Sequence, residues 1–258
     1  MTVSTDDVIA YYKFDTGADD AHGSNDGTVY GATLTTGDGG VIDEAYSFAT
    51  NDYIDFSSFS GVKAFQFWVK TDASVPSGSI YECVLQPNRG TVYSALWLGS
   101  PAGEVVDEIV SFWTGSSSSK FYYWDTTDVG FANFNADDWY HIVITWDSSN
   151  SNYRLYINGS DKGLANEYGS PTEQSTWSSP TLGRRSDGVY FDGDIDEFAL
   201  FNRALTGAEV SELYNSGDGL QYPFGSSGFS KTVNGVSSYS KINGTDATDI
   251  TKLNGVDA

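Results

Sequence analysis

The stretch FDGDIDEFALFNRALTGAEVSEL, residues 191–213, decides the fold of this chain. Its apolar first half predicts a buried strand over Ile195–Phe201. Thr206 is placed to open a helix as its N-cap, because Glu209 follows three positions later and completes a capping box. Gly217 lies just beyond the last apolar residue at helical spacing and predicts the end of that helix. The stretch therefore predicts a strand followed by a short closing helix.

Alternation of apolar and polar residues continues through the rest of the chain and predicts many short strands. WYHIVITW (139–146) alternates clearly, and the Asn158-Gly159 pair after Tyr153–Ile157 predicts a hairpin turn. Further strands are expected at 9–14, 45–48, 53–56, 64–70, 81–85, 94–98, 109–113, 120–124 and 179–183. Short strands separated by Gly, Ser and Asp turns are typical of an all-β sandwich.

Five blocks of sequence occur in the order found in one known family. They are YYKFD with DAHGSNDGT, AFQFWVK, DDWYHIVITWD, YRLYINGSDKG and the stretch quoted above. From about Val8 to Tyr214 the chain resembles the laminin-G-like, concanavalin A-like jelly rolls of the lectin/glucanase superfamily. The resemblance implies an all-β, antiparallel two-sheet jelly-roll sandwich over residues 1–217, with one short C-terminal helix. Proteins of that fold mostly bind partners at their surfaces.

A short internal repeat follows the sandwich, in a segment over residues 218–258. SKTVNGV, SKINGTD and TKLNGVD each place a lysine before an Asn-Gly pair. The repeated positions are Lys231, Asn234, Lys241, Asn243, Lys252 and Asn254. Each copy is too short to form a core, so the segment is either a flexible tail or an attachment segment that orders on another chain. We predict that the segment serves attachment or homo-oligomerisation, because its repeats resemble those of tail and fibre proteins of tailed viruses.

The composition excludes several classes of partner. The formal net charge is −22, with 35 acidic and 13 basic residues, which argues against nucleic acid and anionic membranes. No apolar run approaches the roughly 20 residues of a membrane span, so we expect no membrane insertion. Cys83 is the only cysteine, so no internal disulfide can form. The first residues show no basic and apolar pattern of a signal peptide, and we expect none.

An acidic, glycine-rich loop is the first candidate site. Ca²⁺ prefers carboxylate, amide and carbonyl oxygens, and DTGADDAHGSNDG (15–27) supplies such groups. The family resemblance implies a structural Ca²⁺ held by Asp20, Asn25 and Asp196, with Asp26 as a further ligand from the same loop. In the alternative interpretation, these side chains cap their own backbone turn. His22 stands where the family often has serine.

The carboxylates of Asp194-Ile195-Asp196-Glu197 are the second candidate, because they superficially resemble a glycoside hydrolase motif. Retaining hydrolysis needs two carboxyl groups about 5–5.5 Å apart on one side of the sugar. Alternate strand residues share a face, and the positions that should supply the second carboxylate hold Phe198 and Ala199. We therefore predict that the protein is not an enzyme.

Aromatic residues are the third candidate. FYYW (121–124) places rings on both faces of one strand, and one pair is expected to be exposed for stacking on sugars. The expected ligand-binding residues are Tyr122, Trp124, Trp177, Arg184 and Tyr190. The alternative is that these rings fill the core or an oligomer interface. For Arg184-Arg185, internal ion pairs are the default expectation in so acidic a chain.

Together these features predict a non-catalytic binding or structural protein displayed on a surface. A virion surface is favoured, as a fibre, tail or capsid-decoration component of a phage or archaeal virus that adheres to host-surface glycans. Its partners are then other virion proteins, or other copies of itself, through the C-terminal segment. The alternatives are a secreted or cell-surface carbohydrate-binding module, a structural protein without glycan affinity, and a polysaccharide-degrading hydrolase.

Overall fold

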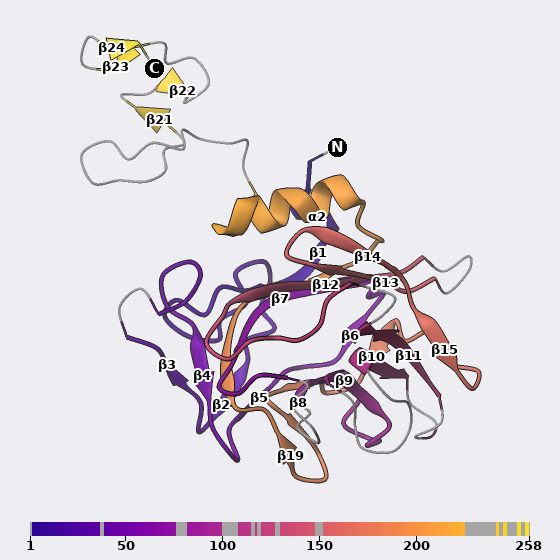
Figure 1. The fold of residues 1–258 in the computed structure, drawn as a ribbon. Helices are drawn as coiled ribbons and strands as arrows, with labels where there is room; N and C mark the ends of the chain where they lie inside the picture. The colour runs from indigo at the N-terminus through magenta and orange to yellow at the C-terminus, as the bar shows by residue number, and fades with distance from the viewer. Residues whose placement is uncertain are drawn as a thin grey trace. The chain divides into compact units, whose positions relative to one another are not determined.

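The computed structural model describes residues 2–36, 39–75, 82–99, 108–114, 117, 120–126, 130–147 and 152–224, together with four short strands beyond residue 240. The chain divides into two units, residues 1–222 and residues 223–258. The first unit is an antiparallel β-sandwich, and Figure 1 shows its two layers of strands.

Two large sheets, here called sheet A and sheet B, make the sandwich. Across sheet A the strands run β14 (Ser160–Leu164), β13 (Arg154–Ile157), β12 (Tyr140–Thr145), β7 (Ala64–Thr71), β20 (Gly193–Phe201), β4 (Tyr46–Phe48) and β3 (Thr33–Leu34), and β1 (Val8–Tyr12) also pairs with β20. Across sheet B they run β15 (Asn166–Tyr168), β11 (Phe121–Asp125), β10 (Glu108–Thr114), β9 (Ser94–Leu98), β8 (Glu82–Gln86), β17 (Thr181–Leu182), β5 (Tyr53–Asp55) and β2 (Thr28–Tyr30). The predicted all-β jelly-roll fold is confirmed.

The core lies between the sheets and is rich in aromatic rings. Trp146 stacks on Tyr153 with ring centroids 4.7 Å apart, and Phe65 from sheet A meets Phe112 from sheet B at 5.6 Å. Inward-facing residues of both sheets alternate with outward-facing ones, as in other aligned sandwiches. The predicted strands correspond to observed ones with shifts at their ends. The alternation pattern did not indicate the short strands β2, β3, β14 and β15 or the small pairs β6–β16 (Phe59–Ser60, Thr176–Trp177) and β18–β19 (Arg184–Arg185, Val189–Tyr190).

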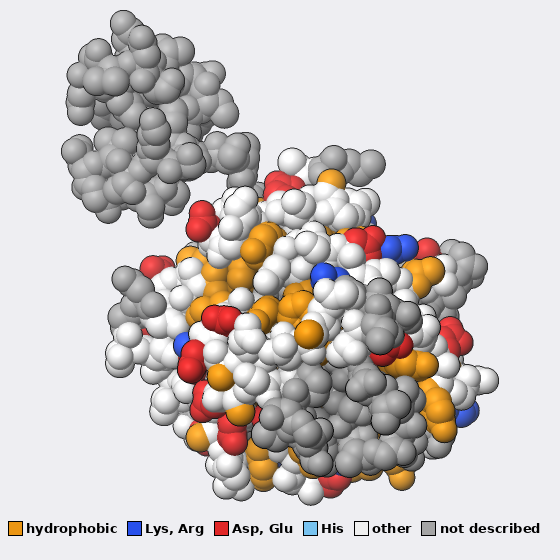
Figure 2. Space-filling view, viewed as in Figure 1, with side chains coloured by type: hydrophobic (Ala, Val, Ile, Leu, Met, Phe, Trp, Pro, Cys, Tyr) orange, Lys and Arg blue, Asp and Glu red, His pale blue; other side chains and the backbone are white. Residues whose placement is uncertain are grey.

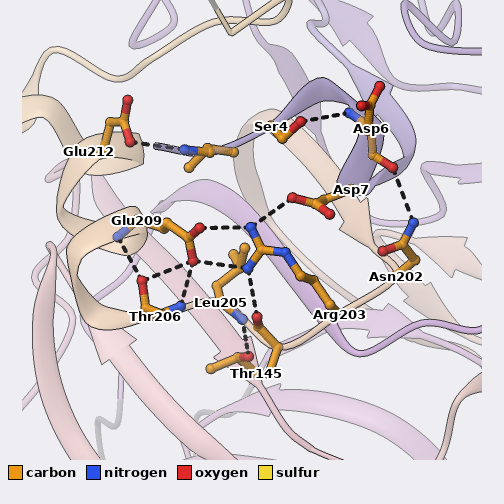
Figure 3. Close-up of polar contacts among 12 residues, drawn as sticks. Ser4, Asp6, Asp7, Thr145, Asn202, Arg203, Leu205, Thr206, Glu209 and Glu212 are labelled. Carbon is orange, nitrogen blue, oxygen red and sulfur yellow. Dashed lines mark hydrogen bonds and ion pairs between the residues drawn. The ribbon is translucent and has the colours of Figure 1, made fainter. Parts of the chain in front are cut away.

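The quoted signature stretch forms β20 and helix α2 (Gly207–Tyr214), joined by a tight polar link. Thr206 caps α2, with reciprocal hydrogen bonds between Thr206 and Glu209, so the predicted capping box is confirmed. The Arg203 guanidinium binds Asp7 at 2.7 Å and both oxygens of Glu209 (Figure 3). Burial would raise the pKa of the Glu209 carboxyl, but the bonds from Arg203 and Thr206 outweigh it and lower that pKa to about 2. This link ties the helix to the turn η1 (Thr5–Asp7) at the start of the chain.

Helix α2 covers the outer face of sheet A, as Figure 1 shows. Its Tyr214 stacks on Trp68 of β7 at 5.6 Å, and Trp68 packs on His141 of β12 at 4.9 Å. Burial lowers the pKa of His141 to about 3, so this histidine is neutral in its contact with the helix. The helix ends at Tyr214 because Asn215 adopts the left-handed conformation at its C-cap, ahead of the predicted stop at Gly217.

The sandwich unit extends past the predicted boundary at Gly217 to Tyr222. The reason is a set of contacts with β1. The Tyr11 hydroxyl lies 3.2 Å from the carbonyl oxygen of Leu220, and the Tyr11 ring lies 5.3 Å from the ring of Tyr222. We call Leu220–Tyr222 the exit segment, because it is the last part of the chain that belongs to the sandwich.

The second unit contains two short hairpins. β21 (Lys241–Ile242) pairs with β22 (Thr245–Asp246), and β23 (Lys252–Leu253) pairs with β24 (Val256–Asp257). Each hairpin flanks one Asn-Gly pair of the repeat, and in both the lysine lies opposite an aspartate. Lys231, Asn234, Asn243 and Asn254 lie outside the described residues.

Acidic side chains are scattered over the face of the sandwich drawn in Figure 2, with few basic ones among them. This distribution agrees with the net charge of −22. Within the described ranges, no helix is long and apolar enough to cross a membrane.

Candidate functional site

The structure corrects three of the predicted ligand-binding aromatics. Tyr122, Trp124 and Trp177 are buried in the core between the sheets rather than exposed. Tyr122 stacks on Tyr153 at 4.0 Å, and the indole N–H groups of Trp124 and Trp177 donate to the carbonyl oxygens of Gly163 and Gln174. The inward face of FYYW is thus the pair 122 and 124, and the core alternative holds for these rings.

The opposite pair of the same strand belongs to an aromatic ladder on the outer face of sheet B. Ring contacts run from Trp97 (β9) to Trp113 (β10) at 5.8 Å, then to Phe121 (β11) at 5.6 Å, and finally to Tyr168 (β15) at 5.0 Å. The central rings are at most 5% exposed, and buried Cys83 packs among them. Tyr168 ends the ladder and is 38% exposed. The interior of this ladder is a second small core rather than an open platform.

The hairpin β18–β19 lays two arginines on aromatic rings of sheet B. The Arg185 guanidinium lies 4.7 Å above the Trp97 ring and forms two hydrogen bonds with the Asp187 carboxylate. The Arg184 guanidinium lies 3.3 Å above the ring of Tyr53 on β5. Guanidinium groups favour such stacking because the ring face is electronegative.

Tyr53 in turn stacks on Tyr30 of the edge strand β2. Their ring centroids are 4.5 Å apart with an interplanar angle of 16°, and Tyr30 is 44% exposed. Tyr190 lies opposite Arg184 in the β18–β19 register, and both are half-buried. We call Tyr30, Tyr53, Arg184 and Tyr190 the Arg184 corner. It combines an exposed aromatic ring with a positioned cation at one edge of sheet B.

Arg184 differs from the other four arginines of the chain, because it forms no ion pair within the described part of the structure. Arg89 pairs with Asp55, Arg154 with Asp161, Arg185 with Asp187, and Arg203 with Asp7 and Glu209. The Arg184 Nε is buried and has no hydrogen-bond partner there. The expected internal ion pair is therefore found for Arg185 and not for Arg184. The predicted positions Arg184 and Tyr190 are the two that the structure brings together with an exposed aromatic ring.

The residues predicted to bind calcium occupy two separate hydrogen-bond systems. The Asp20 carboxylate accepts from the backbone N–H groups of Tyr11, His22 and Asn25 at 3.0–3.2 Å, and Asp26 accepts from the N–H of Asp20. This pattern matches the alternative in which the acidic side chains cap their own turn. The loop is anchored this way to β1.

Asp196, predicted as a calcium ligand, is completely buried on β20. It accepts from the N–H groups of Val41, Ile42 and Glu197 at 2.8–3.2 Å. Burial raises the pKa of Asp196 to about 8, although these N–H groups oppose the shift. The described residues contain no group of three or more His, Cys, Asp and Glu side chains placed to hold a metal. Calcium binding by Asp20, Asn25, Asp26 and Asp196 stays a prediction.

Glu197 lies in a bulge of β20, with φ of 51° and a shift of register between Asp196 and Ala199. Its carboxyl group contacts the Tyr11 hydroxyl and accepts from the Gln221 side-chain amide at 3.0 Å. Burial, together with the neighbouring Asp196, raises the pKa of Glu197 well above its usual range. A hydroxyl carries a single proton, so Tyr11 can serve both Glu197 and the Leu220 carbonyl when Glu197 is protonated and donates to it. This arrangement, the Glu197 clamp, holds the exit segment on the sandwich.

The carboxylates of the hydrolase-like motif are also occupied by internal partners. Asp194 forms an ion pair with Lys70 at 2.7 Å, and Asp196 and Glu197 bind as described above. Phe198 and Ala199 supply no carboxyl group. None of these groups lines the Arg184 corner.

A separate groove of about 250 Å³ lies at the edge of sheet A. It is lined by residues of β12–β14 and of the link before α2, including Asn152, Arg154, Tyr156 and Leu164. Arg154 is ion-paired with Asp161 at 2.6 Å. This groove is an alternative place for a ligand, separate from the Arg184 corner.

A sequence model described as the concanavalin A-like lectin/glucanases superfamily matches residues 36–211. A search of curated proteins finds no significant match.

Many solved structures share the fold. Domain 4 of AbnA, an extracellular GH43 arabinanase from Geobacillus stearothermophilus, solved with arabinotriose, is 23% identical with a TM-score of 0.57 and covers 80% of this chain and 97% of that one. The botulinum neurotoxin type G receptor-binding domain is 16% identical with a TM-score of 0.55, over 81% of this chain and 51% of that chain. Trypanosoma rangeli sialidase in complex with the inhibitor DANA is 13% identical with a TM-score of 0.50, over 83% and 34%. At these identities the similarity is one of fold, and for the last two proteins this chain spans about half or less of the other.

Proposed function

Because the chain belongs to the concanavalin A-like lectin/glucanases superfamily, we propose that it is a non-catalytic module that binds glycans at the Arg184 corner. The observation that carries this proposal is the stack of Tyr30, Tyr53 and Arg184, which ends in an exposed ring. A fold alone does not define a function, so the proposal depends on this site.

The chemistry of the corner suits a sugar. The apolar face of a pyranose or furanose ring packs on an exposed tyrosine ring, while sugar hydroxyls accept from nearby N–H donors. Arg184 carries five N–H donors and no acceptor, and Tyr190 adds a hydroxyl group that donates and accepts. Tyrosine also contributes contact area at a low cost in side-chain entropy. The exposed Tyr30 ring and the Arg184 guanidinium lie at the two ends of one stack, with the Tyr53 ring between them. The corner therefore suits an oligosaccharide that reaches both ends.

The same geometry supports binding without catalysis. The Arg184 corner includes no carboxyl, histidine or cysteine side chain that would act as a general acid, a base or a nucleophile. The carboxylates of the hydrolase-like motif are held by Lys70, by backbone N–H groups and by Tyr11. The carboxylates that the hydrolase-like motif would offer for polysaccharide degradation are therefore engaged by internal partners, which supports a binding role.

A glycan array with matched variants tests the proposal. We expect the wild-type chain to bind a defined set of glycans and Tyr30→Ala to lose that binding while it still unfolds cooperatively. The matched control is Tyr168→Ala, which removes a ring of similar exposure from the opposite edge of sheet B. No binding to any glycan would overturn the proposed function, and loss with Tyr168→Ala alone would overturn the site. Release of new reducing ends from the bound glycan would overturn the non-catalytic assignment.

We further propose that residues 223–258 mount this module on a virion, as part of a fibre, tail or capsid surface that meets host glycans. The support is the internal repeat and the two hairpins with equivalent register in this unit. An isolated two-stranded hairpin is at best marginally stable in water, which favours a role in which these hairpins order on another chain. We expect a chain truncated after Tyr222 to keep glycan binding and to lose co-sedimentation with particles. Co-sedimentation that survives this truncation would contradict the attachment role.

A further inference from the structure

We infer that the sugar recognised at the Arg184 corner carries a carboxylate group. This inference rests on the proposed glycan binding and names the class of glycan, one with a uronic or sialic acid residue. The observation behind it is a guanidinium without an ion-pair partner in the described part of a strongly acidic chain.

Arg184 differs from the other arginines of the chain in its partners. The chain has 35 acidic residues and only five arginines, and the other four arginines each bind at least one carboxylate. Exposed arginines in such a chain meet carboxylates readily. Arg184 instead lies flat on an aromatic ring, in a position that is fixed by β18 and β5.

The carboxylates nearest to the corner in sequence and register have other partners. Asp55 accepts from Arg89 and from the Thr181 hydroxyl. Asp52 accepts from the N–H of Ala49, and Asp187 is bound by Arg185. These contacts engage the acidic groups, and among the described residues none of them forms an ion pair with Arg184.

The stacking geometry selects a planar acceptor. When one face of a guanidinium lies on a ring, its N–H donors point outward in the plane of the group. Arg184 Nε is buried, which leaves the terminal nitrogens to bind the ligand. Two parallel N–H bonds from an arginine match the two oxygens of a carboxylate. A neutral hydroxyl would use only part of this capacity.

The net charge of −22 sets a limit on the ligand. Charges separated by more than about 8 Å are largely screened at physiological salt, so a contact with Arg184 is not cancelled by distant acidic residues. A long polyanion would extend beyond the corner and meet the acidic surface. The ligand is therefore a glycan with an isolated carboxylate rather than a densely charged polymer.

The test compares an oligosaccharide that ends in one glucuronate with its methyl ester, measured by titration calorimetry. The ester removes the charge and keeps the ring. We expect the ester to bind about 10- to 100-fold more weakly, in line with a charged hydrogen-bond pair. Arg184→Gln should lose the difference between acid and ester, and Arg184→Lys should recover only part of it. Arg154→Gln is the matched control, because it removes the same charge from sheet A and should leave the difference unchanged.

The outcomes separate this inference from the proposed function. Equal affinity for acid and ester, with binding still lost in Tyr30→Ala, would overturn the carboxylate and keep the glycan-binding function. Preference for a sulfated analogue over the glucuronate would also overturn it. Failure of every glycan would overturn the proposed function itself. Thermal melts of each variant, with cooperative unfolding required, exclude loss of folding as the cause.

Discussion

The Glu197 clamp and the Arg184 corner are both built around an ionisable residue on a strand of the sandwich, but they differ in the partners of that residue. In the clamp, Glu197 contacts Tyr11 and Gln221, and neighbouring Asp196 accepts from three backbone N–H groups. In the corner, Arg184 has a ring below it and no carboxylate partner in the described residues. The clamp uses its polar groups internally, whereas the corner keeps donors for a ligand.

This contrast limits the usual inference from a perturbed pKa to a functional site. Asp196 and Glu197 have strongly raised pKa values, and such groups often mark active sites. Here burial and internal hydrogen bonds explain the shifts, and the groups hold the chain where it leaves the sandwich. Unsatisfied donor capacity beside an exposed ring is the better guide in this molecule.

Removing the clamp acid should produce the largest effect on stability. Glu197→Ala leaves Tyr11 and Gln221 without a shared partner and empties a buried site, so we expect a loss of about 2–4 kcal/mol in the free energy of unfolding. Glu197→Gln keeps the shape and a donor toward Tyr11, and it should cost less than half as much. Urea unfolding at neutral pH measures both. A Gln variant as unstable as the Ala variant would contradict a clamp held by the protonated acid, because Gln reproduces the neutral group and its donor.

The pH dependence of stability and of glycan affinity should distinguish the Glu197 clamp from the Arg184 corner, with the second largest effect. The folded-state pKa values of Asp196, about 8, and Glu197 are raised above their unfolded values. Their contribution to stability is therefore complete below the unfolded pKa and is lost as pH rises toward about 8. We expect the urea midpoint to fall between about pH 5 and pH 8, while glycan affinity at Arg184 stays constant because arginine remains charged. A midpoint that rises through this window would contradict the protonated clamp.

Loss of the corner cation should have a small effect on stability. Arg184→Gln removes one stacking contact on Tyr53, so we expect a change of about 0.5–1 kcal/mol or less in unfolding free energy. The measurement is the same urea titration, run beside Arg154→Gln. A cost near that of Glu197→Ala would mean that Arg184 is a structural residue and would end the contrast between the two regions.

Calcium removal should have the smallest effect of all. Asp20 and Asp196 already accept several backbone N–H bonds, so any bound Ca²⁺ adds little to what holds the loop. At a calcium concentration near Kd, we expect EDTA to lower the melting temperature by about 1–2 °C. A much larger drop would show that a metal holds the loop and that the backbone bonds are secondary.

The sequence predicted the fold well because local signals and the hydrophobic pattern agreed. Thr206 and Glu209 defined a cap from three positions of sequence, and the alternation in residues 139–146 located β12. The site was predicted less well, because alternation shows that two faces exist without showing which one is inward. Tyr122 and Trp124 were assigned to the wrong face for this reason.

Long-range pairing accounts for what the sequence missed. The stack of Tyr30 on Tyr53 depends on the pairing of β2 with β5, and Arg184 reaches Tyr53 from a hairpin more than a hundred residues away along the chain. The Glu197 clamp joins β1, β20 and the exit segment in the same way. An acidic pair in a strand and an Arg-Arg pair were visible in the sequence, but their partners were not.

Glycan binding at the Arg184 corner is best tested by a structure of the complex with the glycan that binds most tightly on the array. We expect an oligosaccharide with one ring packed on Tyr30 and a carboxylate bound by the terminal nitrogens of Arg184. A glycan seated instead in the groove beside Arg154 and Leu164, with Arg184 unchanged, would contradict it.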